Sequence, residues 1–208
     1  MTAREAPSDQ RAGRRPLPGR LVYQLWALLA AAWFLLDQAT KLWAVARLEG
    51  REAIDLGVLD LRFVRNPGGA FGIPGLFPGL FVLVTVVVVV LVLRALPRTD
   101  RLWLAAAYGL VTGGALGNVA DRLFRDPGFP SGMVVDFLDL RWWPVFNVAD
   151  IGIVSGAALI ALLLLVVDRE ERASERARAA HRSIRPETAD MPPRSVPGDP
   201  ASESPAGE

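Results

Sequence analysis

Cysteine is absent from this chain, and histidine occurs once, at His181 in a polar segment near the C-terminal end. The lack of cysteine excludes disulfides, a thiol nucleophile and thiolate metal sites. One distant histidine cannot build a Ser-His-Asp triad or an H-E-x-x-H zinc site in the apolar part of the chain. Enzymatic chemistry there must therefore rest on carboxylates, or on a serine together with the only lysine, Lys41.

An excess of charge is also lacking, because the net charge is +1 over 208 residues. Such a chain has no electrostatic basis for binding nucleic acid, and we expect no nucleic-acid partner. What the chain has instead is apolar sequence, since 51% of its residues are hydrophobic.

Four long uncharged runs approach the ~20 residues that cross a hydrocarbon core. They predict an all-α membrane protein with four transmembrane helices. No internal repeat is visible, which weakens an inverted-repeat transporter as an interpretation. The runs are Leu21–Leu36, Ile73–Leu93, Leu102–Ala120 and Ile151–Val167.

Arginine is concentrated before the first run, between the second and third, and after the fourth. By the positive-inside rule, both termini of this multi-pass cell-membrane protein are cytoplasmic. The loops 44–72 and 121–150 then face outward, and Ile54–Val64 alternates enough to predict strands of a small extracytoplasmic β-sheet beside an outer-face loop. A cleaved signal peptide ending at Ala44-Val45-Ala46 is the alternative for the first run, but the charges of Asp37 and Lys41 precede that site.

Three regions are expected along the chain. Residues 1–19 are rich in Arg, Pro and Gly and predict a disordered cytoplasmic tail. Residues 20–168 form the four-helix membrane domain. Residues 169–208 are first charged, where they can extend the last helix, and then rich in Pro, Ser, Glu and Gly, which predicts a disordered cytoplasmic end.

Acidic residues lie at the ends of the apolar runs, notably Asp121, Asp136 and Asp150. A carboxylate near the bilayer is costly, roughly 2.5–3.5 kcal/mol at mid-depth, so such residues indicate function by default. Asp136 lies in the extended-looking segment Val134–Leu138, and Asp150 opens the fourth helix, with Asn147 as its candidate N-cap. If the segment folds against the helix start, the two carboxylates share a proton and can activate water as acid and base.

Five motifs in order resemble the lipoprotein signal peptidase family, the type II signal peptidases of bacteria. The resemblance covers residues 21–167. The motifs are Asp37-Gln38-Ala39-Thr40-Lys41, Arg65-Asn66-Pro67-Gly68-Gly69-Ala70-Phe71, Gly114-Ala115-Leu116-Gly117-Asn118-Val119-Ala120-Asp121-Arg122, Val134-Val135-Asp136-Phe137 and Phe146-Asn147-Val148-Ala149-Asp150. Gly69 departs from the pattern, since alanine is common there, but it touches no catalytic position.

The resemblance implies an aspartyl endopeptidase that removes the signal peptide from diacylglyceryl-modified prolipoproteins, cleaving before the lipidated lipobox Cys. It implies Asp136 and Asp150 as the catalytic dyad, at the outer face of the membrane. It implies no metal and no cofactor, contact with membrane lipid, and a monomer. The residues expected to bind substrate or support the site are Asp37, Lys41, Asn66, Gly68, Asn118, Asp121, Arg122 and Asn147.

Several of these residues have a structural role as the alternative to substrate binding. Arg122 could form an ion pair with Asp121 and hold the outer loop. Asp37 and Lys41 are four residues apart on a helix, so an i,i+4 pair competes with substrate contact. Residues 66–69 are typical of a turn, and the tryptophans near span ends are typical of interfacial anchors. These anchors are Trp26, Trp43, Trp103, Trp142 and Trp143.

Three other classes of protein stay open at this point. A channel would place ionisable groups at mid-depth, whereas the acids here gather at one face. A scaffold would not need Asn-x-x-Asp segments on successive elements. A Ser/Lys hydrolase would use Ser131 with Lys41, although no oxyanion-hole pattern accompanies Ser131. Within the dyad, the helix start favours Asp150 as the ionised partner and Asp136 as the protonated one.

Overall fold

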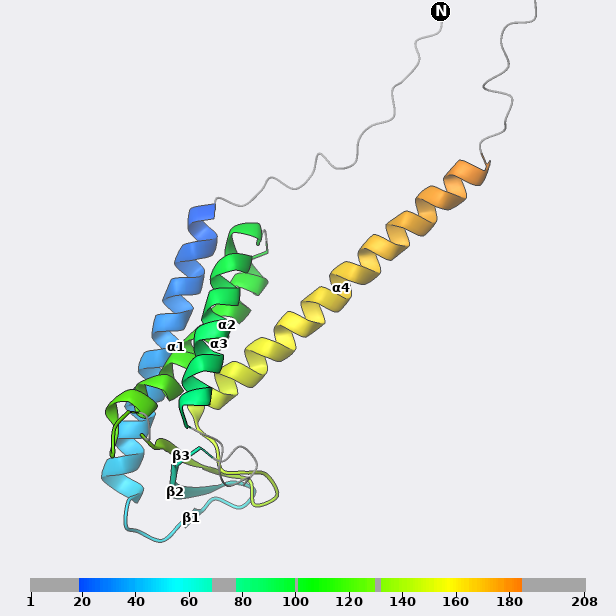
Figure 1. The fold of residues 1–208 in the computed structure, drawn as a ribbon. Coiled ribbons are helices and arrows are strands. Elements are labelled where there is room, and N and C mark those ends of the chain that lie inside the picture. The colour runs from blue at the N-terminus through cyan, green and yellow to red at the C-terminus, as the bar shows by residue number, and fades with distance from the viewer. Residues whose placement is uncertain (1–18, 69–77, 100, 130–131, 185–208) are drawn as a thin grey trace, which may run out of the picture. The chain divides into compact units, whose positions relative to one another are not determined.

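Four helices form the frame of the molecule in the computed structural model, which describes residues 19–68, 78–99, 101–129 and 132–184 (Figure 1). Each helix is long and apolar enough to cross a membrane, which confirms the prediction of four spans. The helices are α1 Gly19–Leu48, α2 Pro78–Ala95, α3 Leu102–Phe124 and α4 Val148–Ile184, with the 3₁₀ turn η3 Leu96–Arg98 after α2. Residues 1–18 and 185–208 of the two tails, the start of the second apolar run, Gly69 and Ser131 lie outside the described residues.

The chain divides into two compact units, Met1–Leu164 and Leu165–Glu208. In the second unit the helix continues through the charged segment to Ile184, as the sequence allows. An i,i+4 ion pair of 2.9 Å joins Asp168 Oδ2 to Arg172 Nε on that stretch. All of the candidate site residues belong to the first unit.

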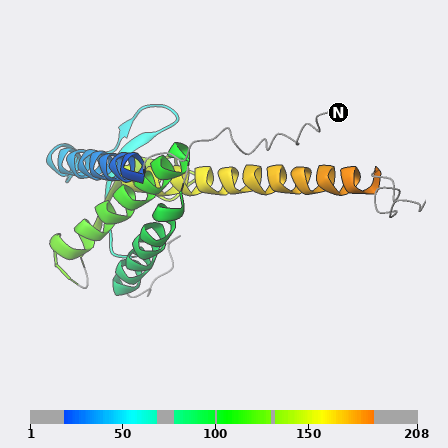
Figure 2. The ribbon, with the colours of Figure 1, turned by 90° about the horizontal axis from the view of Figure 1, so that it is seen from above.

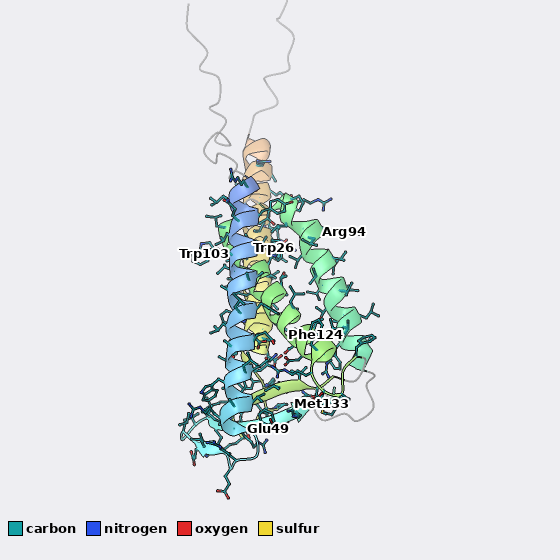
Figure 3. All side chains as sticks on the ribbon, turned by 90° about the vertical axis from the view of Figure 1, so that its left-hand side faces the viewer. Trp26, Glu49, Arg94, Trp103, Phe124 and Met133 are labelled. Carbon is teal, nitrogen blue, oxygen red and sulfur yellow. The ribbon has the colours of Figure 1, made fainter. Side chains whose placement is uncertain are left out.

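A three-stranded antiparallel sheet connects the two loops predicted to share one side of the membrane. Its strands are β1 Ile54–Asp55, β2 Asp60–Asn66 and β3 Val134–Asp139, in the order β1-β2-β3. β1 and β2 follow α1, whereas β3 follows α3, so pairing of β2 with β3 requires both loops to lie at the same end of the helices. Figure 1 shows the sheet at that end, and in Figure 3 Glu49 and Met133 lie there, opposite Trp26, Arg94 and Trp103.

Alternation along β3 directs Val135 and Phe137 to one face of the strand and Asp136 to the other. Val135 and Phe137 pack with Ala44 and Leu48 of α1 in one buried cluster. The side chain of Asp136, between them in sequence, therefore points to the other face, where it is nonetheless only 3% exposed. The end of α1 thus supports the strand that carries a candidate catalytic acid.

Small residues allow α3 to approach its neighbours closely (Figure 2). A Cβ added at Gly113 would lie 2.5 Å from the carbonyl oxygen of Ala30 on α1, and one at Gly109 would lie 2.8 Å from Cβ of Leu29. On another side of α3, a Cβ at Gly114 would clash with the carbonyl oxygen of Ala149 on α4. Such small-residue contacts are the usual means of close helix packing in membranes.

Candidate active site

The start of α4 is held by a reciprocal cap. The backbone N–H of Asp150 donates to Oδ1 of Asn147 at 3.0 Å, and the backbone N–H of Asn147 donates to Oδ2 of Asp150 at 3.1 Å. This is the capping-box arrangement with Asn and Asp in place of the usual pair, and it confirms Asn147 as the N-cap. The carboxylate of Asp150 lies in the first turn of α4, at the positive end of the helix dipole.

Asp136 projects from β3 toward this helix start. Its Oδ1 accepts a hydrogen bond of 2.7 Å from Nδ2 of Asn147, and its Oδ2 accepts one of 2.9 Å from Nδ2 of Asn66. Asn66 is opposite Val134 in the register of β2 and β3, so it reaches Asp136 along the cross-strand diagonal. The predicted approach of the extended segment to the helix start is therefore present.

Asn118 of α3 contacts the other acid, Asp150. Its Nδ2 donates to Oδ1 of Asp150 at 2.8 Å, and its Oδ1 accepts a bond of 3.1 Å from Nδ2 of Asn147. Asn147 thus contacts Asp136, Asp150 and Asn118 at once, and its side chain is fully buried. Amide groups can both donate and accept, which suits them to orient two neighbouring carboxyl groups.

Behind Asn118 lies a buried ionic cluster centred on Lys41. Its Nζ is 2.9 Å from Oδ2 of Asp37, 3.0 Å from Oδ2 of Asp121 and 2.9 Å from Oδ1 of Asn118. Lys41 and Asp37 are both 0% exposed. The i,i+4 pair expected from their spacing is present, and its burial separates Lys41 from any bound substrate.

Asp37 also caps α4 from a different helix. Its Oδ1 accepts a bond of 2.8 Å from the backbone N–H of Ala149, one of the N–H groups that a helix start leaves unpaired. Trp33, one α-helical turn earlier, donates from Nε1 to the carbonyl oxygen of Val148 at 3.0 Å. Two side chains of α1 therefore hold the helix start that presents Asp150.

Asp121 and Arg122 do not form the ion pair that their adjacency suggested. Asp121 instead pairs with Lys41 and with Nε of Arg125, at 2.6 Å, and accepts a bond from the backbone N–H of Val135 at 3.1 Å. Successive helical residues point about 100° apart, so the i,i+4 partner Arg125 is better placed than Arg122.

Arg122 holds the outer segments, as expected, but through backbone carbonyls. It donates from Nη1 to the carbonyl oxygen of Gly132 at 3.0 Å and to that of Asn66 at 3.3 Å. Its guanidinium also lies 5.0 Å from the ring centroid of Phe81 on α2, in cation–π contact.

Residues 66–68 form the predicted turn. The backbone N–H of Gly68 donates to Oδ1 of Asn66 at 2.9 Å, which is an Asx turn. The φ of Gly68 is 126°, a left-handed value that favours glycine. The turn leaves Nδ2 of Asn66 directed at Asp136.

A cavity of about 370 Å³ brings these groups together. Its polar lining contains both Asp136 and Asp150, and its apolar lining comes from α2, α3, β3, α4 and the segment before Asn147. The polar lining residues are Asn66, Thr85, Asn118, Arg122, Asp136 and Asp150, and the apolar ones include Phe81, Val84, Trp143, Val145, Phe146, Ile153 and Val154. Trp143 thus lines the site, whereas the sequence favoured interfacial anchoring over substrate binding for this residue.

Burial of the carboxyl group raises the pKa of Asp136 to about 7. The neighbouring Asp150 acts in the same direction, while the hydrogen bonds from Asn66 and Asn147 and the charge of Lys41 act against it. Asp136 therefore holds a proton readily near neutral pH. Two carboxyl groups with different environments can divide the roles of acid and base.

Sequence reasoning missed three residues that lie outside the cavity lining and contact the groups behind it. Gln38 donates from Nε2 to Oδ2 of Asp37 at 3.0 Å and to the carbonyl oxygen of Gly117 at 3.1 Å. Trp33 and Arg125 are the other two. The i,i+4 spacing of Asp121 and Arg125 was a usable signal, but nothing in the sequence marked Gln38 or Trp33. Among the described residues, no group of three or more His, Asp or Glu side chains is placed to hold a metal ion.

Comparison with known proteins points to one family. The profile described as signal peptidase (SPase) II matches residues 29–166. The chain is 45% identical to the lipoprotein signal peptidase of Rhodococcus jostii, over 79% of this chain and 85% of that protein. It is 43% identical to the lipoprotein signal peptidase of Streptomyces griseus, over 70% of this chain and 76% of that protein.

A solved structure has the same fold. It is a bacterial membrane enzyme determined by the in meso method at 1.9 Å resolution, and its TM-score against this chain is 0.58. The sequence identity is 28%, and the match covers 67% of this chain and 92% of that one. The correspondence thus includes nearly all of the solved chain.

Proposed function

This chain belongs to the signal peptidase II family of lipoprotein signal peptidases, and on that premise we propose that Asp136 and Asp150 are its catalytic dyad. Membership makes the protein a peptidase of bacterial membranes that acts on lipoprotein precursors. The observation that carries the proposal is that both carboxyl groups line one cavity, each held by asparagine side chains. That arrangement is what an aspartyl peptidase needs.

The two acids divide the chemistry. Asp150, at the helix start, takes a proton from water, and the resulting hydroxide attacks the carbonyl carbon of the scissile amide. Asp136 gives its proton to the carbonyl oxygen, and a tetrahedral diol results. When the C–N bond breaks, Asp150 gives the proton that it took from water to the leaving nitrogen, one hydroxyl of the diol returns its proton to Asp136, and a carboxylic acid results. Asn66, Asn118 and Asn147 hold both carboxyl groups throughout, and no cofactor is required.

The substrate is a diacylglyceryl-modified prolipoprotein, cut before its lipidated lipobox Cys. The apolar cavity wall supports this assignment, because α2 contributes Phe81 and Val84 and α4 contributes Ile153 and Val154. Val84 and Val154 are 51% and 67% exposed, so the wall continues onto helix faces that meet hydrocarbon in a bilayer. An acyl chain can reach such a wall directly from the membrane.

The active site faces outward, and both termini are cytoplasmic. The sheet and the start of α4 lie at one end of the helices. The arginine-rich segments before α1 and after the apolar part of α4 are cytoplasmic by the positive-inside rule. One chain supplies the whole cavity, so a monomer is sufficient for activity.

A cleavage assay on purified protein tests the proposed reaction. We expect release of the signal peptide from a diacylglyceryl-modified prolipoprotein, and no cleavage when the lipobox Cys is replaced by Ser so that it cannot be modified. A metal chelator should leave the rate unchanged, because carboxyl groups provide both acid and base. Equal cleavage of the lipidated and unlipidated precursors would contradict the substrate assignment.

The activity should fall as the pH rises through about 7. Asp136 must hold its proton to act as the acid, and burial raises its pKa to about 7. Above that value the protonated fraction, and with it kcat/KM, falls about tenfold per pH unit. Asn66→Ala should move this basic limb to higher pH, because the hydrogen bond from Asn66 lowers the pKa of Asp136. A rate that instead increases through pH 7 would make Asp136 the base.

A further inference from the structure

Lys41 is too deeply buried to contact the substrate, yet it is one hydrogen bond away from the dyad. Its ammonium group has three N–H donors, and three acceptors surround it: Asp37, Asp121 and Asn118. No donor is left for a ligand. Any effect of its hydrogen bonds on catalysis must therefore pass through a neighbour.

That neighbour is Asn118, whose amide can be oriented in two ways. If its Oδ1 faces Lys41, its Nδ2 donates to Asp150; if the amide is flipped, an oxygen faces the carboxylate oxygen of Asp150. An ammonium group donates and never accepts. The Nζ of Lys41, 2.9 Å from Oδ1 of Asn118, therefore excludes the flipped orientation and keeps an N–H directed at Asp150.

We propose, on the basis of the dyad assignment above, that Lys41 is a positioning residue that locks the amide of Asn118 so that Asp150 always receives a donor. Asn147 also donates to Oδ1 of Asn118, but weakly. Its Nδ2 is 3.1 Å from that oxygen and 2.7 Å from Oδ1 of Asp136, so the acid is the better acceptor of the two. The charged donor, Lys41, is the stronger restraint.

Arg125 offers a matched control. It also pairs with Asp121, with its Nε 2.6 Å from Oδ1, and so contributes a positive charge to the same cluster. Its guanidinium contacts Oδ1 of Asp121, whereas Lys41 contacts Oδ2. Removing this charge disturbs the ionic cluster while the bond from Lys41 to Asn118 stays in place.

A double-mutant cycle with Lys41→Met and Asn118→Ala tests the proposal in the full-length protein. We expect each single variant to lower kcat about 100-fold, a typical effect of a displaced catalytic group, with little change in KM. The double variant should be no slower than Asn118→Ala, because Lys41 acts through the side chain already removed. Arg125→Gln should retain kcat within about threefold.

The pH profile supplies a second readout that a purely structural role would not move. Lys41 also lowers the pKa of Asp136 through its charge, so Lys41→Met should move the basic limb to higher pH, and Arg125→Gln should not. The charged groups near the dyad are Lys41 and Asp37 on α1 and Asp121 and Arg122 on α3. The lining that α2 contributes, Phe81, Val84 and Thr85, is uncharged.

Loss of the buried positive charge can also prevent folding, since Asp37 and Asp121 would be left facing each other. The double variant Lys41→Met/Asp121→Asn avoids this repulsion, because it removes one charge of each sign. Its kcat is compared with that of Asp121→Asn alone. The proposal predicts the same additional 100-fold loss of kcat in that background. The proposal would be overturned if Lys41→Met/Asn118→Ala lowered kcat by the product of the two single losses. It would also be overturned if Lys41→Met or Lys41→Met/Asp121→Asn kept the wild-type kcat.

The two proposals fail in different ways. If Asp136→Asn or Asp150→Asn still cleaves the prolipoprotein, the dyad assignment is wrong, whatever Lys41 does. If both dyad variants are inactive while Lys41→Met keeps the kcat and the pH profile of the wild type, only the positioning role is wrong.

Discussion

Replacing either Asp136 or Asp150 with Asn is expected to lower kcat by about a thousandfold or more, since general acid–base transfer contributes 10²–10⁴ for each participating group. Asn has nearly the shape of Asp but cannot carry the exchanged proton. Each variant loses one acceptor oxygen as well. Asp136 accepts from Asn66 and Asn147, and Asp150 accepts from Asn118 and the backbone of Asn147, so one bond, about 1 kcal/mol, is lost in each.

Asp139→Asn separates the chemical effect from the structural one. Asp139 is also on β3 and only 6% exposed, and its Oδ2 is 2.8 Å from Nε of Arg62. Its carboxylate contacts Arg62 and the backbone N–H of Arg141, and neither of these residues belongs to the dyad or the cavity lining. This control should keep wild-type kcat. Substantial turnover by Asp136→Asn or Asp150→Asn, measured with the lipidated precursor, would remove that residue from the chemistry.

Asn147 is the second position at which a single substitution should have a large effect. Its Oδ1 caps α4, while its Nδ2 donates to Asp136 and Asn118. Asn147→Ala removes both functions. We expect the free energy of unfolding to fall by about 1 kcal/mol from the lost cap and kcat to fall about 100-fold from the displaced carboxyl group.

Asn147→Ser distinguishes the two functions, because a serine hydroxyl caps a helix but is too short to replace the amide donor to Asp136. Its thermal stability in detergent should exceed that of Asn147→Ala, while its kcat should be equally low. If serine restores both stability and activity, the cap alone accounts for the role of Asn147. If it restores neither, the side chain has a packing role that the hydrogen bonds do not describe.

The elements that carry the site follow from local patterns in the sequence. Lengths of apolar runs predict the four spans, and alternation around Gly57 predicts strands that become β1 and β2. Asn147 before an apolar run, with an acid three residues later, predicts the cap of α4. These features depend on neighbouring residues, and the structure confirms them. The five motifs likewise lead to the family that the comparisons establish.

The partners of the buried charges depend on contacts that only the tertiary structure decides. Asp121 pairs with Lys41, 80 positions earlier by their residue numbers, rather than with adjacent Arg122. Lys41 is buried because small residues such as Gly113 let α3 approach α1, and Trp143 lines the cavity. The sequence by itself determined the spans, the cap and the acids, because those depend on local composition. The packing of α1, α3 and α4 determined which donor each acid receives, because hydrogen bonds require an approach to about 3 Å that sequence spacing does not specify.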